Sequence, residues 1–253
     1  MYKEKIIGIV GGVGPYAGID LQQKIARQTI ANKDQDHLTV FSISQPNQIL
    51  DRTEYLLGYV DTNPALAMAQ QLIQLHKMGA EVAGIPCNTA HAPQIFNQIR
   101  TKLEKEGCSI HLLHMIEETA VYLQTNHPTI KKVGILSTTG TYKTQIYPQV
   151  LEPMGFTAVV PDFDMQENLI HPAIYDPEFG IKAKGANETA RNYLLTGVTA
   201  LTEKGAEAIV LGCTEIPLAI PETKIGPTLC VDPTHILARA LIREANVGKL
   251  RME

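Results

Sequence analysis

The sequence of 253 residues lacks long apolar stretches and low-complexity tracts. Its first apolar run, Ile6 to Val10, is far shorter than the hydrophobic region of a signal peptide. Nowhere do about 18 apolar residues run together, as a membrane helix requires. We therefore expect a cytoplasmic protein without a membrane partner. The 44% hydrophobic and 19% charged content is typical of a folded globular protein rather than a disordered or fibrous one.

Basic clusters are also missing. The net charge is −4, the sequence pI is about 6.1, and the lysine and arginine residues are scattered along the chain. Proteins that bind a phosphate backbone ordinarily carry a basic patch or stripe. The charge distribution therefore argues against a nucleic acid partner.

Cysteine is scarce, and no C-x-x-C pair occurs among the four cysteines, at positions 87, 108, 213 and 230. Because a cytoplasmic chain keeps its thiols reduced, a disulfide scaffold is not expected. Cys87 and His91 stand four positions apart, but the paired ligand spacings of a zinc site are missing. We expect no metal, a local hydrogen-bonding or packing role for His91, and structural roles for Cys108 and Cys230.

Short β-branched runs alternate with longer helical patterns, which predicts an α/β fold with mainly parallel sheets. The length suits one large domain or two small ones. The predicted strands cover residues 5–10, 38–43, 81–85, 110–114, 132–136, 157–160, 208–211 and 229–231, and the clearest helices cover 64–78 and 188–204.

The chain also repeats a pattern. Each of those two helices ends at a glycine, Gly79 or Gly205, and a cysteine stands eight positions further on, after a strand, at Cys87 or Cys213. The cysteines are 126 positions apart (213 minus 87), and the same shift relates two other glycine pairs, Gly8 with Gly134 and Gly14 with Gly140. Two unrelated α/β units could share such generic features. A duplicated fold would instead present both cysteines at equivalent strand ends, where ligands bind in parallel sheets, across a shared cleft.

Both cysteines precede a polar, helix-starting turn, in P-C-N-T-A-H at 86–91 and G-C-T-E at 212–215. Unpaired N–H groups and the helix dipole at such a turn favour a thiolate, so we expect a lowered thiol pKa. A single buried cysteine is more often an inert apolar residue. Two at equivalent positions favour chemistry, because inverting a stereocentre without a cofactor requires a base on one face of the carbon and an acid on the other.

These two segments, with G-G-V-G-P at 11–15, resemble the aspartate racemase branch of the Asp/Glu racemase family over essentially the whole chain. Glu215 stands where glutamate racemases carry histidine, which favours aspartate. The resemblance implies two pseudo-symmetric three-layer α/β domains, each with a mainly parallel four-stranded sheet, and an active site in the cleft between them. The first domain would comprise residues 1–113 and 232–253, with the C-terminal helix packed on it, and the second residues 114–231. It also implies cofactor-independent racemisation of an acidic amino acid by Cys87 and Cys213, no pyridoxal phosphate or metal, and a homodimer.

The resemblance also suggests residues that hold the substrate. Arg52 matches the arginine of the family's P-D-R-T motif, which grips a carboxylate, although Leu50 replaces the proline. Lys182, or failing that Lys184, matches the lysine that reaches the other carboxylate, next to an insertion at 176–180. The other candidate contacts lie in turns rich in hydrogen-bond donors: Gly12, Asn88, Thr89, Thr139, Thr141, Thr214 and Glu215.

The sequence supports other functions less well than amino-acid racemisation. The glycines at 12, 14 and 18 form G-x-G-x-x-x-G rather than the dinucleotide-binding G-x-G-x-x-G, and no acidic residue closes the second strand. An NAD enzyme is thus disfavoured, and no P-loop motif occurs. A racemase of glutamate or of a broader amino-acid range stays open, as does a non-catalytic amino-acid-binding protein, although two complete cysteine motifs favour an enzyme.

Overall fold

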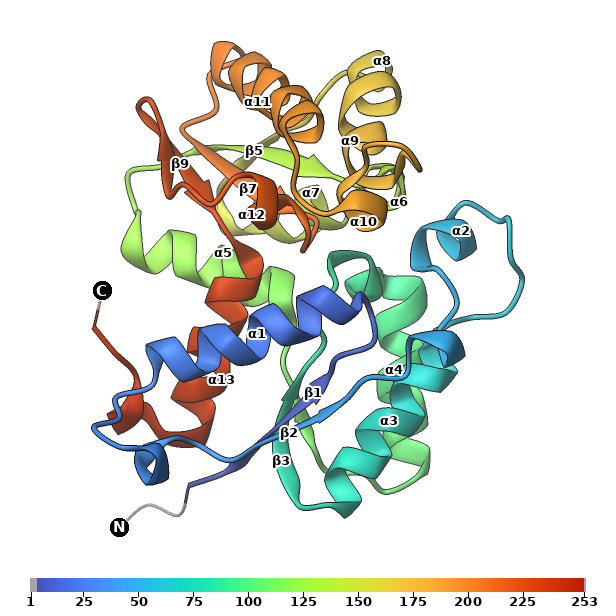
Figure 1. Ribbon diagram of the computed structural model, residues 1–253, viewed down its shortest axis with the longest axis vertical. Helices are drawn as coiled ribbons and strands as arrows, with labels where there is room; N and C mark the ends of the chain where they lie inside the picture. The colour runs from blue at the N-terminus through green and yellow to red at the C-terminus, as the bar shows by residue number, and fades with distance from the viewer. Residues whose placement is uncertain (1–3, 253) are drawn as a thin grey trace. The chain divides into compact units, whose positions relative to one another are not determined.

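A computed structural model describes residues 4–252 of the chain (Figure 1). Contacts between residues divide the chain into two compact units, which are described separately below. Unit 1 contains the residues up to 118 and from 234 onward, and unit 2 contains residues 119–233. Each unit is an α/β domain with a mainly parallel sheet, which confirms the predicted fold class. Within the described part of the chain, no helix has the length and apolar character needed to cross a membrane.

The sheet of unit 1 has four parallel strands in the order β2-β1-β3-β4. β1 (Ile6–Val10) and β3 (Ala80–Gly84) form its centre and are mostly buried, as expected for apolar strands that are covered on both faces, although β3 includes the half-buried Glu81. β2 (Val40–Ile43) and the short β4 (His111–Leu112) form the edges.

Side chains of β1 alternate between two apolar layers, because successive residues of a strand point to opposite faces. Ile7 and Ile9 pack with α1 (Pro15–Gln28) and α13 (Pro233–Asn246). Val10 packs with α3 (Ala65–Lys77) and α4 (Pro93–Lys105) on the opposite face. Unit 1 is therefore a three-layer structure, as its four-stranded sheet and flanking helices show in Figure 1.

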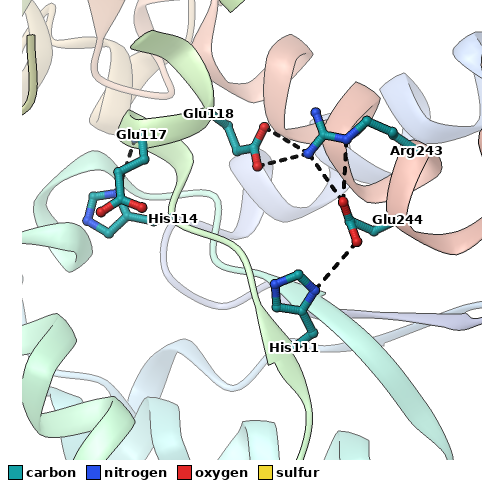
Figure 2. Close-up of polar contacts among 6 residues, drawn as sticks. All are labelled: His111, His114, Glu117, Glu118, Arg243 and Glu244. Atoms are coloured by element: carbon teal, nitrogen blue, oxygen red, sulfur yellow. Dashed lines mark hydrogen bonds and ion pairs between the residues drawn. The ribbon is translucent and has the colours of Figure 1, made fainter. Parts of the chain in front are cut away.

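The C-terminal helix α13 belongs to unit 1 from Thr234 onward. Its Leu237 and Leu241 are fully buried in the layer that contains Ile7 and Ile9. At its end, Arg243 donates hydrogen bonds to Glu118 at 2.9 and 3.1 Å (Figure 2). Glu118 lies on α5 (Met115–Asn126), so this ion pair ties the end of the chain to the helix that leads out of the unit 1 sheet.

Figure 2 also shows how the ion pair extends to the edge of the sheet. Arg243 contacts its neighbour Glu244 at 3.4 Å, and another oxygen of Glu244 lies 3.6 Å from Nδ1 of His111 on β4. Arg243 and His111 are exposed and the two glutamates are half-buried, so water screens these ion pairs and their contribution to stability is small compared with the apolar packing of α13.

The sheet of unit 2 has five strands in the order β6-β5-β7-β9-β8. Four of them are parallel to their neighbours: β5 (Lys132–Ser137), β6 (Thr157–Val159), β7 (Ala208–Gly212) and β9 (Thr228–Val231). The fifth, β8 (Lys224–Ile225), pairs antiparallel with β9 and was not predicted. Its one apolar residue, Ile225, stands between Lys224 and Gly226 and forms no apolar run, so the four-stranded prediction for this sheet is one strand short.

Unit 2 places its longest helix, α11 (Glu188–Glu203), against β5, α9 (His171–Tyr175) and the π-helix Gln166–Ile170, which lies between α8 (Phe163–Met165) and α9. Its other α-helices are α6 (Thr139–Lys143), α7 (Ile146–Leu151), α10 (Ile181–Lys184), α12 (Ile216–Ala219) and the part of α5 from residue 119 onward. The shared apolar layer is built from residues such as Leu136, Ile209 and Leu194.

The eight predicted strands all occur, with ends that differ by one or two residues. Both long predicted helices also end where the glycine pattern places their ends. Gly79 and Gly205 adopt φ values of +108° and +90°, a region that favours glycine because it has no Cβ. The repeated helix–glycine–strand–cysteine pattern thus corresponds to α3–β3 in unit 1 and α11–β7 in unit 2.

Candidate functional site

Three predicted site residues of unit 1 lie at one edge of its sheet. Gly12 follows β1, Arg52 follows β2 and Cys87 follows β3. Because β2, β1 and β3 are parallel neighbours, their carboxyl ends leave the sheet on the same side, where parallel sheets bind ligands. The short helix α2 (Arg52–Leu56), which begins with Arg52, contacts the 3₁₀ helix Asn88–His91 that begins after Cys87.

Cys87 is buried, with a residue exposure of 5%, and it stands immediately before the 3₁₀ helix. Its Sγ atom lies 3.2 Å from Oγ1 of Thr89, and either atom could be the donor. Thr89 and Asn88 are also buried polar residues, so hydrogen-bonding groups surround the thiol on its own loop.

His91 is hydrogen-bonded to the backbone of Cys87. Nδ1 of His91 lies 2.8 Å from the carbonyl oxygen of Cys87, and because a carbonyl can only accept, Nδ1 carries the proton. The ring stacks on Phe96 at 5.1 Å and meets the edge of His114 at 4.7 Å. Burial, with a smaller effect from His114, lowers the pKa of His91 to about 3, so the imidazole is neutral. His91 thus has the local hydrogen-bonding role that the sequence indicated.

Arg52 is a buried cation, with a residue exposure of 7%. Its Nη1 donates to the carbonyl of Leu50 at 3.2 Å, and Asp51 caps α2 by accepting hydrogen bonds from the N–H groups of Thr53 and Glu54 at 2.7 and 3.0 Å. The turn is therefore closed by Asp51 even though Leu50 replaces the family's proline. A buried guanidinium in such a fixed turn is suited to bidentate contact with a carboxylate.

Gly12 lies where two strand-end loops come together. A Cβ atom at this position would stand 2.7 Å from the backbone nitrogen of Gln45, in the loop after β2. A side chain here would displace backbone rather than a flexible group, so the close approach of the loops after β1 and β2 requires glycine.

In unit 2, the register of the central strands brings two candidate loops together. Ser137 at the end of β5 pairs with Gly212 at the end of β7. The threonines after Ser137 and the cysteine after Gly212 therefore leave the sheet side by side.

The threonine loop is closed by its own side chains. Thr138 caps α6 by accepting a hydrogen bond from the N–H of Thr141 at 3.4 Å, and Thr141 is buried. Thr139, also buried, donates its hydroxyl to Glu167 at 2.6 Å. Glu167 lies in the π-helix Gln166–Ile170, a kind of distortion that is frequent at functional sites. Neither Thr138 nor Glu167 was predicted as a site residue, and no local sequence pattern marks the π-helix that carries Glu167.

Cys213 takes part in a buried cluster with Glu215 and Lys182. Sγ of Cys213 lies 3.0 Å from Oε2 of Glu215, which also accepts from the hydroxyl of Thr214 at 3.1 Å. Nζ of Lys182, on α10, donates to Oε1 of Glu215 at 2.9 Å and lies 5.1 Å from the centre of the Tyr175 ring. Lys184, the second choice for this role, is exposed. The insertion at 176–180 leads directly into α10 and so into Lys182.

The surroundings of Cys213 do not produce the lowered thiol pKa that the sequence led us to expect. Burial, followed by the nearby Glu215 carboxylate, raises the pKa of Cys213 well above its usual value, so the expected lowering was wrong for this cysteine. The helix that follows it, α12, has only four residues, and its weak dipole is opposed by a negative carboxylate in contact with the sulfur. Burial raises the pKa of Glu215, but Lys182 and the donors from Cys213 and Thr214 outweigh it, and the pKa is lowered overall.

Lys182 and Tyr147 complete the charged and titratable surroundings of Cys213. Burial opposes the charge of Lys182, yet the Glu215 carboxylate raises the pKa of this lysine overall. Tyr147, on α7, is fully buried, which raises its pKa, and its ring lies 3.1 Å from where a Cβ of Gly212 would stand. The cluster therefore contains an ammonium, a carboxylate, a neutral phenol and a protonated thiol.

Comparisons with known proteins agree on one family. A family model described as Asp/Glu/Hydantoin racemase matches residues 10–241. An aspartate racemase from Picrophilus torridus has a similar structure, with 30% identity, a TM-score of 0.79 and coverage of 98% of this chain and 96% of that chain. An aspartate racemase homologue from Pyrococcus horikoshii OT3 shares the fold at 24% identity, with a TM-score of 0.72 and coverage of 95% and 99%. A broad specificity amino-acid racemase from Bacillus subtilis is 28% identical over 183 residues, which cover 68% of this chain and 72% of the relative.

Because His91 is buried and neutral, we expect the stability of the protein to fall as the pH is lowered. Its pKa falls from the ordinary 6.5 to about 3 on folding, so between these values only the unfolded chain binds the proton. The stability that depends on the neutral ring is complete above pH 6.5 and is lost as the pH falls towards 3. Between pH 7 and 5, wild type should lose about 2 kcal/mol in free energy of unfolding relative to His91→Asn, which keeps a donor but does not titrate.

Urea unfolding followed by circular dichroism at several pH values measures this difference. His37→Asn is the matched control, because His37 is exposed and its replacement should leave the pH dependence unchanged. A pH dependence of stability that is the same in wild type and His91→Asn would contradict a neutral His91.

Proposed function

This chain belongs to the Asp/Glu/hydantoin racemase family, and we propose that it racemises aspartate without a cofactor, using Cys87 and Cys213 as the two proton-transfer groups. The observation that carries the proposal is that each α/β unit has a buried cysteine in the loop after a central parallel strand, β3 or β7. The likeness to the aspartate racemase from Picrophilus torridus over nearly the whole of both chains supports aspartate as the substrate.

The proposed reaction moves one proton off the α-carbon and another onto it. A thiolate on one face takes the α-hydrogen, and the thiol on the other face delivers its proton to the resulting carbanion. The product has the opposite configuration, the two thiols have exchanged protonation states, and proton exchange with water restores them. The scheme requires both sulfur atoms to reach the same α-carbon.

Positive groups and hydrogen-bond donors are proposed to hold the substrate and its developing negative charge. Arg52 and Lys182 would each face one carboxylate of aspartate, because both cations are held beside a cysteine loop of their own unit. The strand-end loops would add donors to the carboxylates through Gly12, Asn88, Thr89, Thr139, Thr141 and Thr214. Glu215 instead contacts Cys213 and Lys182, which favours a role beside the thiol rather than in substrate binding.

A second substrate range is supported by one contact. The ammonium of Lys182 is already paired with Glu215 at 2.9 Å, so part of its charge is compensated before any acidic side chain arrives. The relative from Bacillus subtilis is a broad specificity amino-acid racemase. We therefore keep racemisation of a wider set of amino acids as the alternative to aspartate.

Incubation of purified protein with L-aspartate in D2O tests the proposed reaction directly. We expect D-aspartate to form without added pyridoxal phosphate or metal, with deuterium at the α-carbon of the product, because the proton delivered comes from a thiol that exchanges with solvent. Chiral chromatography and mass spectrometry measure both. Neither deuterium nor D-isomer would contradict aspartate as substrate, and a panel of other L-amino acids would then distinguish the broader racemase from an inactive binding protein.

Removal of either thiol should stop turnover, since one face of the α-carbon would then lack its proton-transfer group. Cys87→Ala and Cys213→Ala are each expected to lower kcat for racemisation by about 100-fold or more. Cys108→Ala, which removes a thiol outside the cysteine loops, is the control and should keep normal turnover. A single variant at 87 or 213 with near-normal kcat would overturn the two-thiol scheme.

Arg52→Ala should weaken acidic substrates in particular. Loss of one charge-assisted carboxylate contact costs about 1.5–3 kcal/mol, which corresponds to a fall in kcat/KM for aspartate of roughly 10- to 100-fold. Steady-state kinetics with aspartate measure the loss, and Arg27→Ala, which removes an exposed arginine at the end of α1, provides the control. Unchanged aspartate kinetics would remove Arg52 from the substrate-binding site.

A further inference from the structure

The two cysteine loops look alike in sequence but offer their sulfur atoms different partners. Sγ of Cys213 lies 3.0 Å from a carboxylate oxygen of Glu215, whereas Sγ of Cys87 lies 3.2 Å from the hydroxyl of Thr89. An ionised carboxylate can only accept, so the hydrogen in the first contact must belong to the sulfur. A hydroxyl can donate, so the second contact is compatible with a thiolate.

Glu215 is held in the ionised form that this argument needs. Its residue exposure is 5%, and its two oxygens accept hydrogen bonds from Lys182, Thr214 and Cys213 at 2.9 to 3.1 Å. The ammonium of Lys182 supplies the compensating charge that a buried carboxylate requires. The carboxylate therefore cannot turn away from Cys213 without weakening its partly buried ion pair with Lys182.

From these contacts we infer that Glu215 is a positioning residue that keeps Cys213 in its thiol form, so that in the resting protein Cys213 is the proton donor and Cys87 is the base. The inference rests on the proposed function, in which both cysteines exchange protons with the substrate. It assigns the two cysteines different resting states, which their similar sequence motifs do not distinguish.

Surrounding charges support the same assignment. The titratable groups that face Cys213 are Glu215 from its own loop, Lys182 from α10 and Tyr147 from α7. With the thiol protonated, Lys182 and Glu215 balance each other and Tyr147 is neutral. Ionisation of Cys213 would place a second negative charge 3.0 Å from the Glu215 carboxylate, with a single ammonium to offset both.

A kinetic consequence follows if the protein is a racemase. The equilibrium constant of racemisation is one, so kcat/KM must be equal for the two enantiomers whatever the protein does. A bias between the two resting protonation states therefore appears as different kcat values for the D- and L-substrates, with KM values that differ by the same factor. Glu215→Gln removes the charge and should change this ratio of kcat values while kcat/KM stays equal in both directions.

Ionisation of Cys213 is measured by titrating the ultraviolet absorbance of thiolate in the full chain. Subtracting the titration of the same protein with Cys213→Ser isolates the signal of this one thiol. We expect Glu215→Gln to lower the midpoint by at least one pH unit, equivalent to a tenfold rise in thiolate below the midpoint. Glu222→Gln, which removes a carboxylate paired with Arg191 at the surface of the same unit, is the control and should leave the midpoint unchanged.

Lys182→Met is a second variant, and it should shift the Cys213 midpoint in the opposite direction. It removes the only ammonium in contact with Glu215 among the described residues, so the midpoint of Cys213 should rise rather than fall. Opposite shifts in the two variants cannot come from general loosening of the site. Circular dichroism spectra establish that each variant is folded, and if Glu215→Gln does not fold, the rise in Lys182→Met carries the test alone.

The outcomes separate this inference from the proposed function. An unchanged Cys213 midpoint in folded Glu215→Gln, or no rise in Lys182→Met, overturns the inference regardless of activity. Shifted midpoints in a protein that racemises no amino acid would support control of the proton by Glu215 and overturn the proposed function instead. The protein could also be an active racemase in which the Cys213 midpoint shifts but the ratio of kcat values for the D- and L-substrates stays the same in Glu215→Gln. That result would overturn the assignment of Cys213 as the resting proton donor.

Discussion

Parallel pairing of central strands is the constraint on which the rest of this structure depends. In unit 1, the pairing of β2, β1 and β3 brings Arg52, Gly12 and Cys87 to one edge of the sheet. In unit 2, the pairing of Ser137 with Gly212 sets the threonine loop beside Cys213. Because the central strands β1, β3, β5 and β7 are mostly buried, a shift in their register would disrupt two apolar layers at once, and the loops that follow them are held in place accordingly.

The two units have a similar backbone around their cysteines but surround them with different charges. The loop of Cys87 rests on a neutral imidazole, His91, which holds its carbonyl. The loop of Cys213 carries Glu215, which forms a partly buried ion pair with Lys182 of α10 and contacts the thiol through its carboxylate. A fold that repeats itself can thus present one sulfur beside a hydroxyl and another beside an anion, which is the asymmetry that a proton donor and a proton acceptor need.

Much of the fold was predictable because its signals are local. Apolar runs marked eight strands, and the glycines at 79 and 205 marked the ends of α3 and α11, since only their positive φ values close those turns easily. β8 was not predictable, because its one apolar residue, Ile225, stands between Lys224 and Gly226 and the segment is a strand only through its pairing with β9. The π-helix at Gln166–Ile170 likewise has no sequence signature, so the contact of Glu167 with Thr139 could not be anticipated.

For the candidate site, the sequence by itself determined which residues are candidates for the chemistry: two cysteines after equivalent strands, an arginine after Asp51, and a lysine after an insertion. Only the tertiary structure decided which groups touch. It turned Glu215 towards Cys213 and brought Lys182 to Glu215 from 33 positions away, and so reversed the expected effect on the thiol pKa. The physical reason is that a pKa depends on burial and on charges within a few ångströms, and chain folding, rather than local pattern, sets both.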